Sequence, residues 1–151
     1  MNLLDRFLFL ATTHALDAIT WVHLRMLRVS GGRLGWRTFG VPVLLLTTTG
    51  RKSGQARTVP LYYVRDGAAL VVVASNAGQP DYPGWYFNIQ ADPHATVQMG
   101  RVRRPVVAEI AGPEEKRRLW PRVLQMSALY GGYRQRTPRD IPLVRLWPAN
   151  R

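Results

Sequence analysis

The chain has 151 residues and a formal net charge of +12 at pH 7, with 21 lysines and arginines against 9 acidic residues. This length predicts a single domain, and the charge indicates an anionic partner such as nucleic acid, a membrane surface, or a phosphorylated or polycarboxylate ligand. The chain has no cysteine, which excludes disulfides, thiolate metal sites, iron–sulfur clusters and a cysteine nucleophile.

The N-terminal segment is predicted to form an amphipathic helix. Apolar residues recur at three- and four-residue spacing from Leu4 to Met26, and Ser30-Gly31-Gly32 is a strong stop. The longest apolar run, residues 7–11, is far shorter than the roughly 20 residues of a membrane span, and no signal-peptide pattern is present. We therefore expect a cytoplasmic protein in which residues 1–30 form this helix and residues 31–151 form the folded domain. Residues 1–28 could alternatively contact the inner face of the cell membrane.

The next part of the chain changes from helical spacing to short runs typical of β-strands. Residues 31–40 are predicted to form a Gly/Arg-rich loop. Strands are predicted at residues 42–49, 58–65 and 70–75, and Asp66-Gly67 is a hairpin signal between the last two. We expect these three strands to form an antiparallel meander.

The C-terminal half mixes helices with further strands. A short helix is expected to carry Trp85 to Ala91 and to end at Asp92-Pro93, before strands at residues 94–99 and 102–110. Pro113 favours a helix start, Pro121 is expected to kink or divide that helix, and Gly131-Gly132 to end the segment after it. A last strand is predicted at residues 141–147. Because short turns rather than helical crossovers join most strands, the fold is predicted to be mainly β (α+β), an antiparallel barrel with an N-terminal helix and helices on its rim.

The basic turn at residues 50–57 is a candidate phosphate site. Gly50 and Gly54 allow the backbone to turn and present its N–H groups, while Lys52, Ser53 and Arg57 add two charges and a hydroxyl donor. The turn is not a Walker A loop, because Arg51 stands where that pattern needs glycine. The alternative is a basic hairpin in solvent.

Two further groups could line a pocket. Ser75-Asn76 follows a strand, and Trp85 and Asn88 lie three residues apart on a helix, so together they could seat a planar heterocycle. The alternative is that Trp85 belongs to the core and that Asn88 caps the Asp92-Pro93 turn. Tyr130 and Tyr133, also three apart, could line a pocket or simply pack.

No metal or hydrolase site is expected. His14, His23 and His94 show no ligand spacing, and neither a nucleophile elbow nor a dinucleotide-binding glycine fingerprint occurs.

Several runs of the sequence, taken in order, carry a family resemblance. They are Leu44-Leu45-Leu46-Thr47-Thr48-Thr49-Gly50-Arg51-Lys52-Ser53-Gly54, Pro60-Leu61-Tyr62, Ala74-Ser75-Asn76-Ala77-Gly78, Pro83-Gly84-Trp85-Tyr86-Phe87-Asn88, Asp92-Pro93, Trp120-Pro121, Tyr130 with Tyr133, and residues 139–142. From about Ser30 to Pro148 the chain resembles the deazaflavin-dependent nitroreductase family of the FMN-binding split-barrel superfamily.

The resemblance implies a split β-barrel that binds coenzyme F420, an 8-hydroxy-5-deazaflavin with a phosphodiester and an oligoglutamate tail, in preference to FMN. It implies hydride transfer to an organic acceptor such as a quinone, a nitroaromatic or a conjugated carbonyl compound. Matching positions imply the following roles: the run with Arg51, Lys52, Ser53 and Arg57 for the phosphate and tail; Pro60, Tyr62, Ser75 and Asn76 beside the ring; Trp85 and Asn88 in the pocket wall; Tyr130 and Tyr133 over the acceptor.

The acceptor side departs from the family pattern at Ser127, where some members carry another tyrosine. We therefore expect a more open or more polar acceptor pocket. Tyr133 is the first candidate for the proton donor to the reduced acceptor, and Ser75 is the second. A homodimer is allowed, and no nucleic-acid partner is expected. Two alternatives are a non-catalytic flavin or haem carrier on the same barrel and a polyanion- or nucleic-acid-binding module.

Overall fold

The computed structural model of the chain describes residues 40–150 and, before them, residues 18, 22, 23, 25–27, 29, 30 and 36–38. The described residues from Ala18 to Val29 are helical, and Ser30 lies in a turn. The part of the predicted N-terminal helix before Ala18, and the stop at Gly31-Gly32, lie outside the described residues. None of the helices in the described part of the chain is long and apolar enough to cross a membrane.

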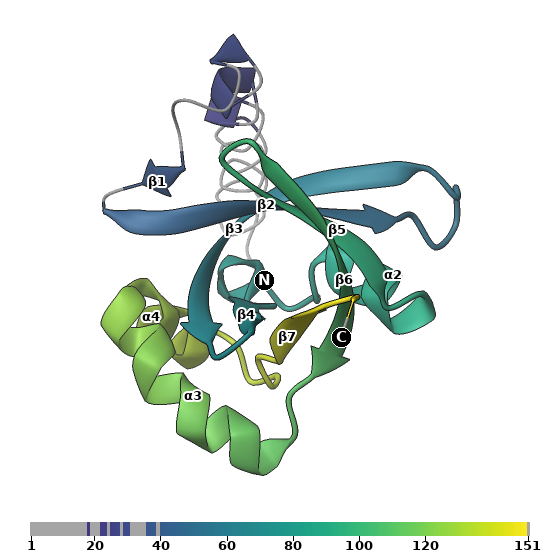
Figure 1. Cartoon of the computed structure of the whole chain (residues 1–151). Helices are drawn as coiled ribbons and strands as arrows, with labels where there is room; N and C mark the ends of the chain where they lie inside the picture. Colours follow the sequence, from purple (N-terminus) through teal and green to yellow (C-terminus); the bar gives the residue numbers. More distant parts are fainter. Residues whose placement is uncertain are drawn as a thin grey trace, which may run out of the picture.

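Six antiparallel strands close into a barrel (Figure 1). The order around the barrel is β2, β3, β4, β7, β6 and β5, and pairing of β2 with β5 closes it. The strands are β2 (Val41–Thr49), β3 (Ala56–Asp66), β4 (Ala69–Val73), β5 (His94–Met99), β6 (Val102–Ile110) and β7 (Leu143–Pro148). The predicted mainly β barrel and the β2–β3–β4 meander are therefore confirmed.

The chain before β2 contains a short strand that the sequence did not predict. Residues 31–40 were expected to form a loop, but β1 (Arg37–Thr38) pairs antiparallel with the start of β2. Gly40 has φ +80°, a backbone conformation that only glycine adopts readily. It lets the chain reverse tightly enough for Arg37 to lie opposite Pro42.

The helices lie outside the barrel. They are the 3₁₀ turn η1 (Asn76–Gly78), α2 (Gly84–Ala91), α3 (Pro113–Met126) and α4 (Leu129–Arg136). Two expected helix ends were wrong: α3 is not divided at Pro121 but continues to Met126, and Gly131 and Gly132 lie inside α4. In both places buried side chains outweigh local propensity, because Trp120 and Val123 flank Pro121 and Tyr130 precedes the glycines.

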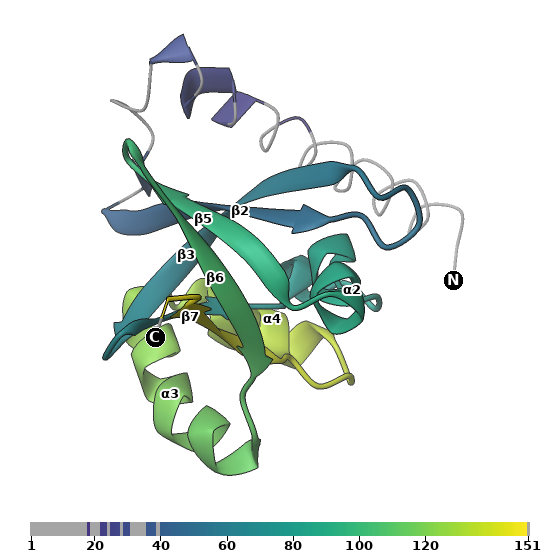
Figure 2. The ribbon, with the colours of Figure 1, turned by 45° about the vertical axis from the view of Figure 1, so that its right-hand side comes forward.

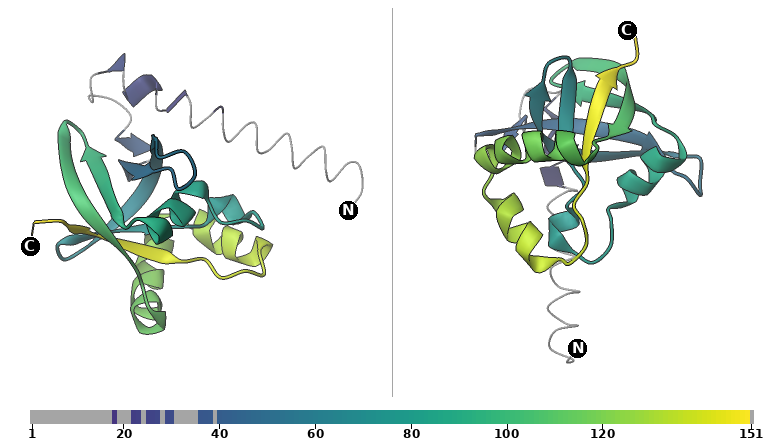
Figure 3. Two further views of the ribbon diagram at one scale, coloured as in Figure 1. Left: turned by 90° about the vertical axis from the view of Figure 1, so that its right-hand side faces the viewer. Right: turned by 90° about the horizontal axis from the view of Figure 1, so that it is seen from below.

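The barrel has an apolar cluster inside it and a second one outside. Strand β4 is buried along its whole length because alternate residues face the two clusters. Leu70 and Val72 belong to the inner cluster, which α2 also contacts through Trp85. Val71 and Val73 belong to the outer cluster beneath α3 and α4. Figure 3 shows α3 and α4 on one side of the barrel, and α2 with the tip of the β2–β3 hairpin on the other.

Candidate functional site

A cationic pocket lies between the β2–β3 hairpin and helix α2. Figure 2 shows the hairpin tip beside α2. The pocket measures about 390 Å³. It is lined by Gly50, Arg51, Lys52, Ser53, Arg57, Val59, Gly84, Trp85 and Asn88. The structure thus brings together two groups of predicted cofactor residues that lie some 30 positions apart in the chain, the basic turn and the Trp85–Asn88 pair.

Asn88 fastens the hairpin to α2. Its amide nitrogen donates to the Thr48 hydroxyl over 3.0 Å, and its amide oxygen accepts from the backbone N–H of Arg51 over 3.1 Å. Asn88 and Thr48 are both buried, so these bonds are shielded from water and hold the turn firmly. The Asn88 side chain therefore supports the basic turn. It does not cap the Asp92-Pro93 turn, which was the alternative.

The two glycines of the hairpin are required by its shape. The Gly50 N–H donates to the Gln55 carbonyl, and the Gly54 N–H donates to the Gly50 carbonyl, each over 2.8 Å. A Cβ on Gly50 would lie 2.6 Å from the Ser53 hydroxyl oxygen, and Gly54 has φ +69°. The tight loop therefore depends on glycine at both positions, and it holds the Ser53 hydroxyl within 3.2 Å of the Gln55 N–H.

The pocket carries positive charge that no carboxylate of the described residues offsets. No acidic residue is among the described residues that line it, and no ion pair of Lys52 or Arg57 occurs within the described part of the chain. Five of the described carboxylates are engaged elsewhere: Asp66, Glu109, Glu115 and Asp140 pair with arginine or lysine around α3, and Asp92 pairs with His94. This pocket can therefore hold a phosphate or carboxylate group.

Helix α2 contributes two aromatic contacts to this site. Trp85 is buried in the inner cluster and also lines the pocket, so it serves both the core and the site. The Arg51 guanidinium carbon lies 4.7 Å from the centre of the Phe87 ring, a cation–π contact that holds the Arg51 side chain against α2.

The other predicted site residues gather on the opposite face of β3. Arg57 and Val59 face the cationic pocket, whereas Tyr62 packs on the outer cluster with Tyr130 and Tyr133. Side chains alternate along a strand, so Pro60 shares the face of Tyr62. The structure therefore places the predicted residues in two groups, one on each face of the same strand.

Tyr130 and Tyr133 form an edge-to-face pair on α4. Their ring centres are 5.7 Å apart and their planes make an angle of 86°. Tyr130 is buried, and burial raises the pKa of its phenol above the ordinary value, so it stays protonated at neutral pH. Tyr133 is half-buried, so part of its side chain is open to solvent. Ser127 lies where α3 ends, and its carbonyl accepts the Tyr130 N–H over 3.3 Å.

Ser75 and Asn76 lie directly after β4, in contact with α4 through Gly78. A Cβ on Gly78 would lie 3.0 Å from the Tyr133 carbonyl oxygen, so the turn and α4 approach as closely as glycine allows. Arg139 binds the same turn through backbone carbonyls, including that of Ser75 over 2.7 Å. No role was predicted for Arg139 from the sequence, because nothing local shows that an arginine 64 residues away reaches this turn.

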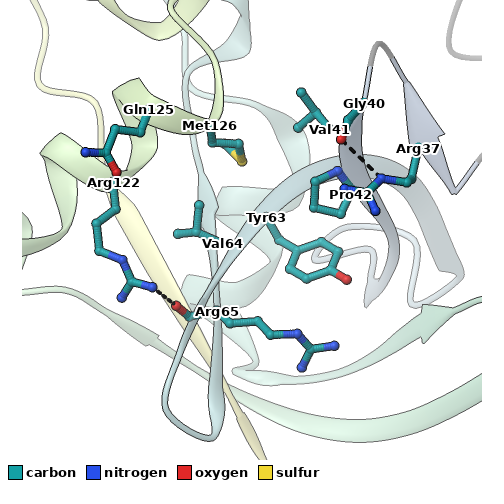
Figure 4. A pocket seen from close by; sticks show the side chains of 10 residues that line it. All are labelled: Arg37, Gly40, Val41, Pro42, Tyr63, Val64, Arg65, Arg122, Gln125 and Met126. Atoms are coloured by element: carbon teal, nitrogen blue, oxygen red, sulfur yellow. Dashed lines mark hydrogen bonds between the residues drawn. The ribbon is translucent and has the colours of Figure 1, made fainter.

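Two further hollows contain none of the predicted site residues. The larger, about 640 Å³, lies between the start of β2, β3 and the end of α3, where Arg122 donates to the Arg65 carbonyl (Figure 4). The other, about 410 Å³, lies beside Trp120, with Arg134 5.4 Å from the Trp120 ring centre. Among the described residues, no three His, Cys, Asp or Glu side chains gather where they could hold a metal ion.

The sequence of residues 20–148 matches the family described as F420H(2)-dependent quinone reductase. The chain belongs to this family. An F420H(2)-dependent quinone reductase of Mycobacterium tuberculosis is 43% identical to it over 127 residues, which cover 82% of this chain and 85% of the relative. The F420-dependent oxidoreductase activity and the deazaflavin cofactor that the resemblance implied are thereby confirmed.

Solved structures of similar and of more distant proteins share the fold. A structure titled as an F420-H2 dependent reductase (FDR-A) is 38% identical, has a TM-score of 0.64, and covers 70% of this chain and 93% of that chain. Another, described as a domain-swapped dimer, is 34% identical with a TM-score of 0.67, covering 83% and 96%. An FAD-binding protein from Mesorhizobium loti, at 17% identity and a TM-score of 0.51 over 72% and 81% of the two chains, is similar in fold alone.

Proposed function

We propose that this quinone reductase binds the phosphate and tail of F420 in the cationic pocket and presents the ring to a quinone near Tyr133. The observation that carries the proposal is the pocket itself. Lys52, Ser53 and Arg57 converge there with no carboxylate of the described residues to neutralise them. An anionic tail would replace water around these groups with charge-assisted hydrogen bonds.

The donor set suits this cofactor better than FMN. FMN has one short phosphate arm, whereas F420 carries a phosphodiester followed by several carboxylates. Three basic side chains line the pocket, Arg51, Lys52 and Arg57, and all three are exposed, so a long anionic chain could contact them in succession. The ring would then lie next to Pro60 and Tyr62 on the other face of β3. It would also lie next to Ser75 and Asn76 on the turn after β4.

Reduced F420 supplies a hydride to an electron-poor acceptor when it is bound. The protein orients the acceptor and donates a proton to the oxyanion that hydride addition leaves on it. Tyr133 is the first candidate, because it is half-buried at the end of the tyrosine pair. Ser75, on the adjoining turn, is the second. Ser127 leaves room beside them for a larger or more polar acceptor.

The chain offers a matched pair of variants for testing the cationic pocket. Lys52 and Lys116 are its only lysines. Lys116 lies on α3 and pairs with Asp140. We expect Lys52→Ala to raise the Kd for F420 about tenfold, the equivalent of about 1.4 kcal/mol for one charge-assisted contact, and Lys116→Ala to leave it unchanged. Fluorescence titration of F420 measures both. Equal Kd values for Lys52→Ala and wild type would refute the assignment of the tail to this pocket.

We also propose a homodimer, because one similar structure is described as a domain-swapped dimer. Sedimentation equilibrium tests the dimer.

Residues 1–30 would form a separate helical arm on a domain of residues 31–151, and the arm would rest on the membrane surface that carries quinones. In the described part of this arm, Val22 and Val29 expose apolar side chains. Co-sedimentation with anionic liposomes, with and without residues 1–28, tests the arm, and equal sedimentation would exclude it.

A further inference from the structure

The turn after β4 has a strained backbone. Asn76, Ala77 and Gly78 follow one another with φ of 47°, 53° and 75°, all in the left-handed region. Glycine adopts this region freely, but a residue with a Cβ adopts it at an energetic cost and keeps the conformation only where its surroundings enforce it. Two such residues in succession therefore need a device that holds them.

Besides the turn's own hydrogen bonds, Arg139 is a device of this kind, because its side chain binds both ends of the turn. Nη2 donates to the Ser75 carbonyl over 2.7 Å and Nη1 to the Ala74 carbonyl over 3.3 Å, before the strained residues. Nε donates to the Gln79 carbonyl over 3.0 Å, after them. One planar guanidinium thus bridges the turn from its first residue to its last.

Further contacts keep the Arg139 guanidinium in place. Its central carbon lies 4.5 Å from the centre of the Tyr82 ring, and Nη1 also donates to the Asp140 carbonyl over 3.0 Å. The backbone N–H of Ala74 donates to the Pro142 carbonyl over 2.9 Å, which fixes the segment of Arg139 against the end of β4. A lysine would keep the charge but could not bridge the two ends with a rigid fork.

The clamped turn joins two parts of the proposed site. Ser75 and Asn76 are at its start, and Gly78, at its end, rests on the backbone of Tyr133. A shift of the turn would therefore move Ser75 and Asn76 relative to Tyr133. We propose that Arg139 is a positioning residue for hydride transfer, which holds this turn so that the ring and the acceptor meet in a reactive arrangement. The inference rests on the proposed roles of Ser75, Asn76 and Tyr133.

The test combines a weakened clamp with relief of the strain. We expect Arg139→Lys to lower kcat about tenfold to a hundredfold, because small misplacements of reacting groups have effects of this size. The Kd for F420 should change little, since the cationic pocket holds the tail. Adding Ala77→Gly should restore most of kcat, because glycine adopts the left-handed backbone without a clamp.

The matched control is Arg118→Lys. Arg118 also binds a distant hairpin with a fork, at Asp66, but far from the turn, so its replacement should leave kcat unchanged. The inference is overturned if folded Arg139→Lys keeps the wild-type kcat, or if Ala77→Gly fails to restore it. Should Arg139→Lys not fold, the double variant decides: a folded, active double variant supports the clamp, and an unfolded one refutes it. Wild-type protein that cannot oxidise reduced F420 would instead refute the proposed function.

Discussion

Individual side chains have different proposed roles at this site. Lys52 and Arg57 line the cationic pocket, Asn88 holds the basic turn, and Tyr130 and Tyr133 would form an aromatic wall beside the acceptor. The pKa of the Tyr130 phenol is raised by burial, so Tyr130 is a poor source of a proton to a bound molecule, whereas Tyr133 is half-buried. At the scale of residues, the first property to test is therefore which side chain donates the proton to the acceptor.

Replacing Tyr133 by phenylalanine removes the proposed donor and leaves the ring in place. We expect kcat for quinone reduction to fall about tenfold to a hundredfold, near the lower end of what a positioned acid contributes, with the Kd for F420 nearly unchanged. Stopped-flow oxidation of reduced F420 measures the step. Tyr63→Phe is the control, because Tyr63 is buried in the inner cluster. Unchanged turnover in Tyr133→Phe would transfer the role to Ser75, to be tested with Ser75→Ala.

Whole elements are held by contacts between segments far apart in the chain. Helix α3 is tied to the β3–β4 hairpin through Asp66, which accepts from both terminal nitrogens of Arg118. Helix α4 meets the turn after β4 at Gly78. The second contact adjoins the turn that carries Ser75 and Asn76, whereas the first fastens α3 to the barrel, and each can be weakened separately.

Gly78→Ala should disturb the contact between the turn and α4. The added methyl group would meet backbone atoms of Tyr133 at 3.0 and 3.1 Å, at a residue whose φ is +75°. We expect a loss of at least about 1 kcal/mol in stability together with reduced kcat. Gly132→Ala is the control in the same helix: nothing lies within 4 Å of its added Cβ, and alanine should stabilise α4 by about 0.5–1 kcal/mol. Equal thermal stability of the two variants would contradict this contact.

The tie between α3 and the barrel should depend on pH. The Arg118 guanidinium holds the pKa of the Asp66 carboxyl below its ordinary value of 3.8. A lowered pKa in the folded state stabilises the fold above pH 3.8, and this contribution is lost as pH falls through the folded-state value. We expect Asp66→Asn to lower stability at pH 7 by about 1 kcal/mol, or about 2–4 °C in Tm, and to differ less from wild type as pH falls below 4. Urea titrations across this range measure it, and a constant difference would contradict the ion pair.

At the scale of the whole molecule, the net charge is +12, and the basic residues differ in whether they pair with carboxylates. Arginines around α3 are paired with carboxylates, whereas the basic residues of the β2–β3 hairpin line a pocket without one among the described residues. The cationic pocket can therefore hold a defined anionic ligand, and we propose that this ligand is the F420 used by the family.

Parallel titrations with F420, FMN and single-stranded DNA would test this use of charge. We expect the tightest binding for F420 and weaker binding for FMN. Any affinity for DNA should disappear at physiological salt, where screening acts over about 8 Å, while shielded contacts in the pocket persist. Tight DNA binding that survives in salt would favour a polyanion-binding module, and stronger binding of FMN or haem would favour a carrier.

Much of the fold follows from local patterns in the sequence. The β5 and β6 strands have the predicted bounds, and α3 begins at Pro113 as predicted, because side-chain alternation and turn residues act over a few positions. The Gly-Arg-Lys-Ser-Gly run likewise indicates an anion site from the sequence alone, because its glycines, basic side chains and hydroxyl group are adjacent in the chain. Local patterns failed at Pro121 and at Gly131-Gly132, where packing of Trp120, Val123 and Tyr130 decides that the chain stays helical.

Only the tertiary structure decided how these pieces meet. Closure of the barrel by β2 and β5, the bonds from Asn88 to Thr48 and Arg51, and the reach of Arg139 to Ser75 join residues 37 to 65 positions apart. No periodicity or propensity encodes such distances, because they depend on how whole strands pair and which faces they bury. The sequence by itself thus determined most of the elements and the kind of ligand, whereas the tertiary structure decided which residues share a pocket and which arginine binds the strained turn.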